Sequence, residues 1–352
     1  MGKIILRRLF SFLLIVAFIA SIFVYPNWYK KQVNKLKGMY YVAQGDKALR
    51  KQDFQKAIDE YRYGLKLYPE HYGAWFNLGN IYVAYEDYYS AVDAYGQAIK
   101  YNPNYVLARM NYGIISVEKL GNFDEAIDQY NKIIGIRRKL VYIPFVFNNL
   151  RSYKTNIGLA YYNRGVAYRQ KSTYLDQDWA YQQQYLQEAI KSYQEAVKIL
   201  KKDYDARYNL ALAYHLNKDY NLAGLTYCEA IQLAPMNYEA HYNLAVLLGH
   251  LRYYKEALSE MYKATTLISN NTGDTNRQRY VFDIMNDVTR KIMLDEDGMK
   301  FLMEEFNVGH DTKAEITYIN GKLVASDDLD KAMLKNFQTC ASKNIFINEE
   351  DF

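Results

Sequence analysis

The chain has 352 residues, half of them hydrophobic, so it is long enough to bury a substantial core. Its 44 Lys and Arg residues against 39 Asp and Glu leave a net charge of only +5, which argues against a nucleic-acid-binding protein. Proline is scarce, at 5 residues, as in a mainly helical chain, whereas tyrosine is unusually frequent, at 38. The two cysteines, Cys228 and Cys340, are too few for a disulfide framework or a zinc site, and they give no indication of the redox compartment.

An apolar run without a charged residue extends from Leu9 to Tyr25. It is at the short end of what crosses a bilayer, roughly 17–25 residues. Trp28 and Tyr29 follow it, as aromatic residues do at a membrane–water interface. The alternative, a cleaved signal peptide, lacks a clean cleavage pattern of small residues. We therefore predict a single-pass anchor and juxtamembrane segment over residues 1–37. The N-terminus is expected in the cytoplasm and the rest on the exported side, although the flanking positive charges do not discriminate this orientation.

From about residue 38 the sequence repeats with a period of about 34 residues. The most regular unit begins at Tyr72, which we number as its first place. Its recurring positions are Trp75, Leu78, Gly79, Tyr82, Ala91, Tyr95, Ala98 and Pro103. The eighth place of each unit is small, which allows two helices to cross closely: Gly45, Gly79, Gly113, Gly165, Ala211 and Ala245. We expect the alanine at the twentieth place to face it. An aromatic residue is expected to open the second helix of most units: Phe54, Tyr88, Phe123, Tyr220 and Tyr254.

This pattern resembles the tetratricopeptide repeat (TPR) family. The resemblance implies an all-α, right-handed superhelical solenoid of about six helix pairs, here over residues 38–271, whose concave groove is lined by the first helix of each pair. It also implies that peptides or protein segments bind in that groove. Two interruptions are predicted. Residues 141–157 contain an apolar run beside a basic triplet. The run is expected either to pack against the neighbouring repeats or to dock a partner or the membrane surface. Residues 172–186 resemble an N-terminal extension of the second helix of repeat four.

The period stops after Asn271, and residues 272–352 are expected to form a small α+β tail. We predict capping helices over 277–306, because a solenoid end needs a polar outer face. Residues 315–326 alternate apolar and polar around Asn320-Gly321, which predicts a β-hairpin.

Catalytic motifs are lacking, so we predict that the protein is not an enzyme and that it has no cofactor. Three histidines, His215, His241 and His250, fall on the first helices of repeats five and six. They could meet at a metal ion, but ordinary surface or groove residues are the favoured interpretation, and we predict no metal site.

The sixth place is asparagine in five of the six units, and we call these residues the asparagine row: Asn77, Asn111, Asn163, Asn209 and Asn243. Three tyrosines at the fifth place form the tyrosine row: Tyr162, Tyr208 and Tyr242. An amide side chain carries both donors and an acceptor, which suits the backbone of an extended peptide. Such a ladder occurs in some TPR proteins. The alternative is that asparagine only helps the fold at this place.

The sequence therefore predicts a membrane-anchored scaffold for protein–protein interaction, which binds a protein or peptide partner in its groove. An alternative is a cell-envelope assembly component that binds a glycan or a lipid-linked ligand, because groove tyrosines can stack on sugar rings.

Overall fold

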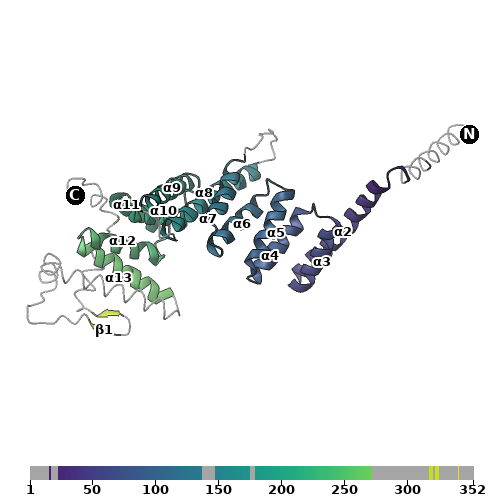
Figure 1. Ribbon diagram of the computed structural model, residues 1–352. Helices are drawn as coiled ribbons and strands as arrows, with labels where there is room; N and C mark the ends of the chain where they lie inside the picture. The colour runs from purple at the N-terminus through teal and green to yellow at the C-terminus, as the bar shows by residue number, and fades with distance from the viewer. Residues whose placement is uncertain are drawn as a thin grey trace, which may run out of the picture. The chain divides into compact units, whose positions relative to one another are not determined.

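The computed structural model describes residues 23–136, 147–174 and 179–271, together with Val16, 317–319, 322–324 and Cys340 (Figure 1). Its helices are α2 (Pro26–Arg50), α3 (Phe54–Leu67), α4 (Tyr72–Ala84), α5 (Tyr88–Tyr101), α6 (Val106–Glu118), α7 (Phe123–Ile134), α8 (Phe147–Tyr174), α9 (Trp179–Ile199), α10 (Tyr204–Leu216), α11 (Tyr220–Leu233), α12 (Tyr238–His250) and α13 (Tyr254–Asn271). The chain divides into two compact units, Met1–Leu140 and Val141–Phe352, which we call the N-terminal and C-terminal units.

The described part of each unit is a stack of three helix pairs. Helices α2 and α3, α4 and α5, and α6 and α7 pair in the N-terminal unit, and α8 to α13 pair likewise in the C-terminal unit (Figure 1). Within each unit a second helix packs on the first helix of the next pair, as α3 does on α4 and α11 on α12. The predicted helical repeats, six in number, are confirmed. Stacking supplies the core that no single pair could bury.

The turn inside a pair follows one design. The second helices α3, α5, α7, α11 and α13 begin at the aromatic residues that the sequence predicted. In four of the pairs, the residue two positions before the second helix is not glycine, yet its backbone is in the left-handed region. These residues are Gln52, Glu86, Lys218 and Arg252, with φ of 59°, 58°, 67° and 63°. This region favours glycine, so these four turns carry local strain.

The small residue at the eighth place packs against a tyrosine ring. A Cβ atom built on Gly79 would lie 2.6 Å from Cε1 of Tyr95, and one on Gly45 would lie 2.7 Å from Cδ1 of Tyr61. The alanine at the twentieth place, which was expected to face the small residue, is buried. A larger side chain at the eighth place would nevertheless meet the tyrosine ring first. The steric requirement therefore comes from the tyrosine at the twenty-fourth place. These rings are almost completely buried: Tyr61, Tyr95, Tyr130, Tyr193 and Tyr227.

Repeat four is longer than the others at the junction of its two helices. Helix α9 begins at Trp179, which confirms the predicted N-terminal extension of the second helix. Helix α8 has 28 residues and includes the second half of the 141–157 interruption. The rest of that interruption, including most of its apolar run, lies outside the described residues.

At the N-terminus, α2 starts at Pro26 and runs without a break into the first repeat. Proline suits the first turn of a helix because its missing N–H would be unpaired there. The predicted anchor, residues 9–25, lies almost wholly outside the described residues. Among those that are described, no helix is both long and apolar enough to cross a membrane.

Two short strands lie in the tail at the positions where the sequence predicted a hairpin. Strands β1 (Thr317–Ile319) and β2 (Lys322–Val324) are antiparallel, with Ile319 paired to Lys322. The predicted capping helices over 277–306 lie outside the described residues.

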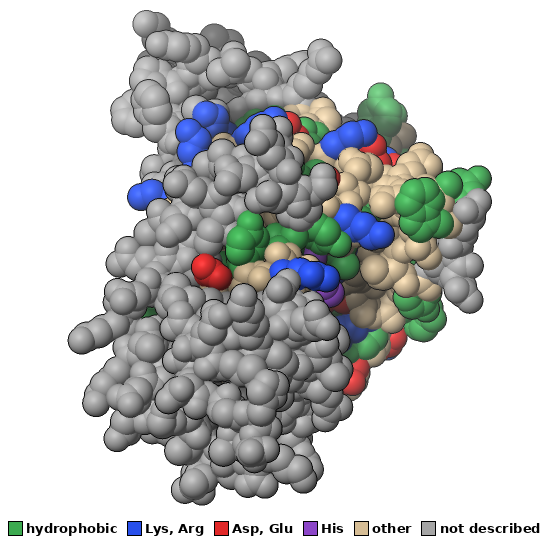
Figure 2. Space-filling model, turned by 90° about the vertical axis from the view of Figure 1, so that its left-hand side faces the viewer, with side chains coloured by type: hydrophobic (Ala, Val, Ile, Leu, Met, Phe, Trp, Pro, Cys, Tyr) green, Lys and Arg blue, Asp and Glu red, His purple; other side chains and the backbone are tan. Residues whose placement is uncertain are grey.

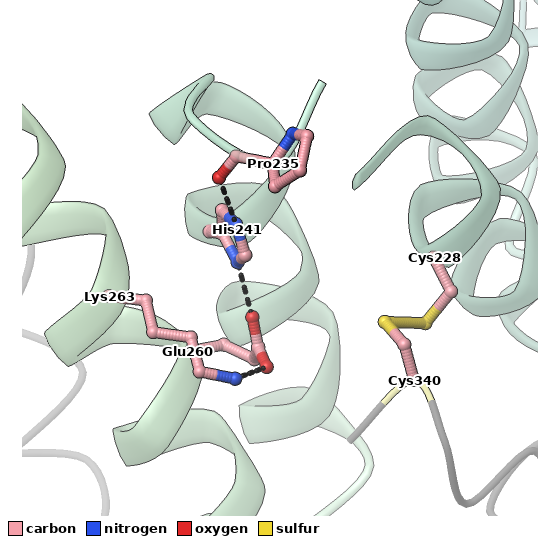
Figure 3. A network of polar contacts seen from close by, with 6 residues as sticks. All are labelled: Cys228, Pro235, His241, Glu260, Lys263 and Cys340. Atoms are coloured by element: carbon pink, nitrogen blue, oxygen red, sulfur yellow. Dashed lines mark hydrogen bonds and ion pairs between the residues drawn. A yellow bond between two sulfur atoms is a disulfide. The ribbon is translucent and has the colours of Figure 1, made fainter. Parts of the chain in front are cut away.

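The two cysteines form a disulfide that the sequence analysis, which considered only a disulfide framework or a zinc site, did not predict. Cys228 on α11 and Cys340 in the tail are bonded, with their Cα atoms 5.3 Å apart, a separation that disulfide geometry requires (Figure 3). The bond joins residues 112 positions apart. Sequence spacing could not reveal it because the pairing depends on where the tail returns to the repeats.

Candidate peptide-binding groove

The face formed by first helices carries the predicted site. In the C-terminal unit, α10 contacts both of the neighbouring first helices, α8 and α12. The fifth, sixth and ninth places of a helix lie on one face because three to four residues make a turn. The asparagines and tyrosines of the two rows therefore lie on the first-helix face of their own unit, and every residue in both rows is half-buried.

In the N-terminal unit, the sixth-place asparagine fastens its repeat to the preceding one. The Nδ2 atom of Asn77 donates to Oδ1 of Asp46 and to the hydroxyl oxygen of Tyr61, both at 3.2 Å. The Tyr61 hydroxyl in turn donates to the Asp46 carboxylate at 2.6 Å. Burial, followed by this hydrogen bond, raises the pKa of Tyr61, so the hydroxyl stays protonated at neutral pH. The three side chains form a closed polar triad.

The triad recurs one repeat later. The Nδ2 atom of Asn111 donates to Oδ1 of Asn80 at 3.2 Å and to the Tyr95 hydroxyl oxygen at 3.4 Å. The Tyr95 hydroxyl donates to the same Asn80 oxygen at 2.7 Å. Burial raises the pKa of Tyr95 as well. Both triads need an acceptor at the ninth place, which Asp46 and Asn80 supply.

In the C-terminal unit the asparagines have different partners. The Nδ2 atom of Asn209 donates to the Tyr162 hydroxyl oxygen at 3.3 Å, and that of Asn243 donates to the Tyr208 hydroxyl oxygen at 2.8 Å. Each also donates to the backbone carbonyl four residues earlier in its own helix. The ninth place is apolar here, so it offers no acceptor: Val166, Leu212 and Val246. The fifth-place tyrosine of the preceding repeat takes over that role.

These contacts divide each asparagine side chain into two halves. In Asn77, Asn111, Asn209 and Asn243, the amide nitrogen is used inside the protein. The Oδ1 atom of each accepts no hydrogen bond from any residue that the structure describes. The sequence analysis left open whether the row helps the fold or binds a ligand. The structure gives the nitrogens a role in the fold and leaves the oxygens available.

Two residues of the tyrosine row, Tyr162 and Tyr208, pack with tilted rings against tyrosines of the second helices. The ring of Tyr162 lies 6.0 Å from that of Tyr193, and the ring of Tyr208 lies 6.3 Å from that of Tyr227. Burial, followed by nearby tyrosine or carboxylate groups, raises the pKa of Tyr162 and of Tyr208. Both hydroxyls therefore remain neutral donors at physiological pH.

A second periodic contact was missed from the sequence. A donor at the fourth place of four repeats reaches the backbone carbonyl six residues earlier, in the turn that precedes its helix. The donors are Trp75 (to Pro69, 2.8 Å), Arg109 (to Pro103, 2.8 Å), Arg207 (to Lys201) and His241 (to Pro235, 3.1 Å). The signal was present, because the donors Trp75, Arg109 and His241 each follow a proline by six residues, at the repeat period.

The last of these donors belongs to a buried charged network (Figure 3). Nδ1 of His241 lies 2.6 Å from the Glu260 carboxylate, while its Nε2 faces the Pro235 carbonyl. Lys263 Nζ contacts the other Glu260 oxygen at 2.6 Å. Burial alone would raise the pKa of Glu260, but the hydrogen bond from His241 and the Lys263 charge outweigh it, so the pKa is lowered. Both His241 nitrogens are therefore engaged, and the network fastens α12 to α13.

The described part of the chain contains no group of three or more His, Cys, Asp or Glu side chains that could hold a metal ion. On the face shown in Figure 2, the described Lys and Arg side chains are spread out rather than gathered in one basic patch.

Sequence profiles of the tetratricopeptide repeat match residues 72–105, residues 42–88 and 178–235, and residues 238–271. The helices within these ranges form tetratricopeptide repeats. No curated protein matches the chain significantly. Solved structures resemble it more loosely. A crystal structure of MamA is 22% identical and covers 55% of this chain and 95% of its own, with a TM-score of 0.43. YrrB, described as a TPR protein with an unusual peptide-binding site, is 18% identical over 57% of this chain and 88% of its own (TM-score 0.41). Pseudomonas aeruginosa pilF is 14% identical over 71% of this chain and 99% of its own (TM-score 0.47). These similarities are too weak to transfer a function.

Proposed function

We propose that the face formed by the first helices of a unit binds an extended protein segment, and that the asparagines on that face hold its backbone. The observation that carries the proposal is the division of the amide side chains. Four asparagine oxygens lack a hydrogen-bond donor among the described residues, while their nitrogens are fixed by the preceding repeat. A fixed acceptor loses little conformational entropy on binding. A row of such acceptors suits the N–H groups of an extended peptide without selecting its side chains.

The test must separate the lost oxygen from the lost contact between repeats. Replacing Asn209 and Asn243 by alanine removes both. Replacing Tyr162 and Tyr208 by phenylalanine removes only the hydroxyls that the asparagine nitrogens use and keeps the rings. We expect the full-length alanine variant to lose a co-purifying partner from gently solubilised membranes, and the phenylalanine variant to keep it. Equal retention of the partner by both variants would assign the row to the fold alone.

We further propose that an N-terminal anchor holds the repeats at a membrane, with the repeats on the exported side. The apolar run over 9–25 motivates the anchor. The Cys228–Cys340 disulfide supports the orientation because disulfides persist in oxidising compartments and are rare in the cytosol. Thiol-reactive polyethylene glycol should label the cysteines of the native cell protein only after reduction, and external protease should digest the repeats in spheroplasts. Protease protection together with free thiols would reverse the orientation.

A further inference from the structure

Three histidines occur on the first helices of repeats five and six, and the structure separates their roles. His241 has both ring nitrogens engaged, one with Glu260 and one with Pro235. It therefore has no ring nitrogen open to a further ligand. The other two, His215 and His250, lie in the last turns of α10 and α12, and these two helices are in contact.

The rings of His215 and His250 approach each other across the two repeats. Their centres are 6.2 Å apart, and their planes are inclined by 80°. A metal ion bound at about 2.0–2.1 Å from a ring nitrogen lies roughly 3 Å from the ring centre. Two imidazoles that share one ion therefore have centres roughly 5–6 Å apart, depending on the angle at the metal. The observed separation of 6.2 Å lies just above this range.

Both imidazoles are available for coordination. Neither makes a hydrogen bond to a described residue, and the contacts of His215 are ring contacts with Tyr220, Tyr227 and His250.

The surrounding backbone also favours a cation. The carbonyl end of a helix carries a partial negative charge, so the last turn attracts positive groups. Here the ends of two neighbouring helices, α10 and α12, present their histidines side by side.

We propose that His215 and His250 form a two-imidazole site for a borderline divalent transition metal, of the class of Zn²⁺, Ni²⁺ or Cu²⁺, which links repeats five and six. Imidazole nitrogen prefers these ions to Mg²⁺ or Ca²⁺, which take oxygen ligands. Water completes the coordination, because the described residues supply no third His, Cys, Asp or Glu to the pair. The site does not depend on peptide binding in the groove.

The test uses the full, disulfide-bonded chain in detergent, purified without a histidine tag. Calorimetric titration with ZnCl₂ should show one site, MgCl₂ should show none, and the electron paramagnetic resonance spectrum of one added Cu²⁺ should show coupling to two nitrogens. His250→Ala changes an exposed residue, and His215→Phe keeps the ring packing but removes both nitrogens. Each should weaken Zn²⁺ binding by roughly tenfold or more, since even outer-shell changes cost 10–100-fold. Each should also remove one nitrogen coupling.

His71→Asn is the matched control. His71 lies on the other unit, where its Nδ1 accepts from the Ala74 N–H at the start of α4, and asparagine can replace it as an N-cap. This variant should bind Zn²⁺ as tightly as the wild type. Unchanged Zn²⁺ affinity in both His250→Ala and His215→Phe, or a Cu²⁺ spectrum without nitrogen coupling, would overturn the proposal.

Discussion

Reduction of the Cys228–Cys340 disulfide should destabilise the C-terminal unit and leave the N-terminal unit unchanged. The bond closes a loop of 112 residues that includes α12 and α13, so it restricts the unfolded chain strongly. For a loop of this size the chain-entropy estimate is about 4.7 kcal/mol at 25 °C. We expect a loss of about 3–5 kcal/mol in the free energy of unfolding, because measured effects commonly fall somewhat below the estimate.

Urea unfolding of the full chain, followed by hydrogen-exchange mass spectrometry, separates the two units because peptides from α4–α6 and from α10–α12 report independently. Wild type is compared with and without a phosphine reductant, and Cys340→Ser without reductant serves as the matched control. The reduced wild type and the serine variant should lose the same stability in α10–α12. A difference below about 1 kcal/mol between oxidised and reduced protein, or an equal loss in α4–α6, would refute the loop-closure argument.

Three further predictions concern stability. Gly79→Ala should lower the free energy of unfolding by roughly 1–3 kcal/mol, because its Cβ would lie 2.6 Å from the Tyr95 ring. Gly96→Ala, with no neighbour nearer than 3.9 Å, should stabilise α5 by up to about 1 kcal/mol. Thermal melts of both variants check this, and stability changes of the same sign would contradict it. Glu86→Gly should raise stability by roughly 0.5–1 kcal/mol, since glycine relieves the left-handed strain at φ 58°; an unchanged or lower melting temperature would show that the turn is unstrained. The pKa of Glu260 is lowered on folding, so its contribution is complete above the pKa of the unfolded chain and is lost as pH falls through the lower folded value. On acidification below about pH 4.5, the C-terminal unit should therefore lose stability more steeply in the wild type than in Glu260→Gln. Urea unfolding midpoints measured against pH check this. Parallel midpoint curves for the two proteins would count against the ion pair.

Local sequence determined the helices. The spacing of small and aromatic residues predicted where the second helices begin, for example at Tyr88 and Tyr220, because helix propensity, turn geometry and the 3.6-residue period act within a few residues. The Asn320-Gly321 signal located the two short strands of the tail for the same reason. The rows of asparagine and tyrosine could also be placed on one face from spacing alone.

Only the tertiary structure decided what those side chains contact. Asn77 and Asn209 occupy the same place in the repeat, yet one bonds to Asp46 and the other to Tyr162, because the ninth place of the preceding repeat is polar in one case and apolar in the other. The tyrosine that requires Gly79, the pairing of Cys228 with the tail and the approach of two histidines across repeats were likewise beyond the sequence. Each depends on how one helix pair rotates and stacks on the next, and that geometry is set by packing between segments far apart in the chain.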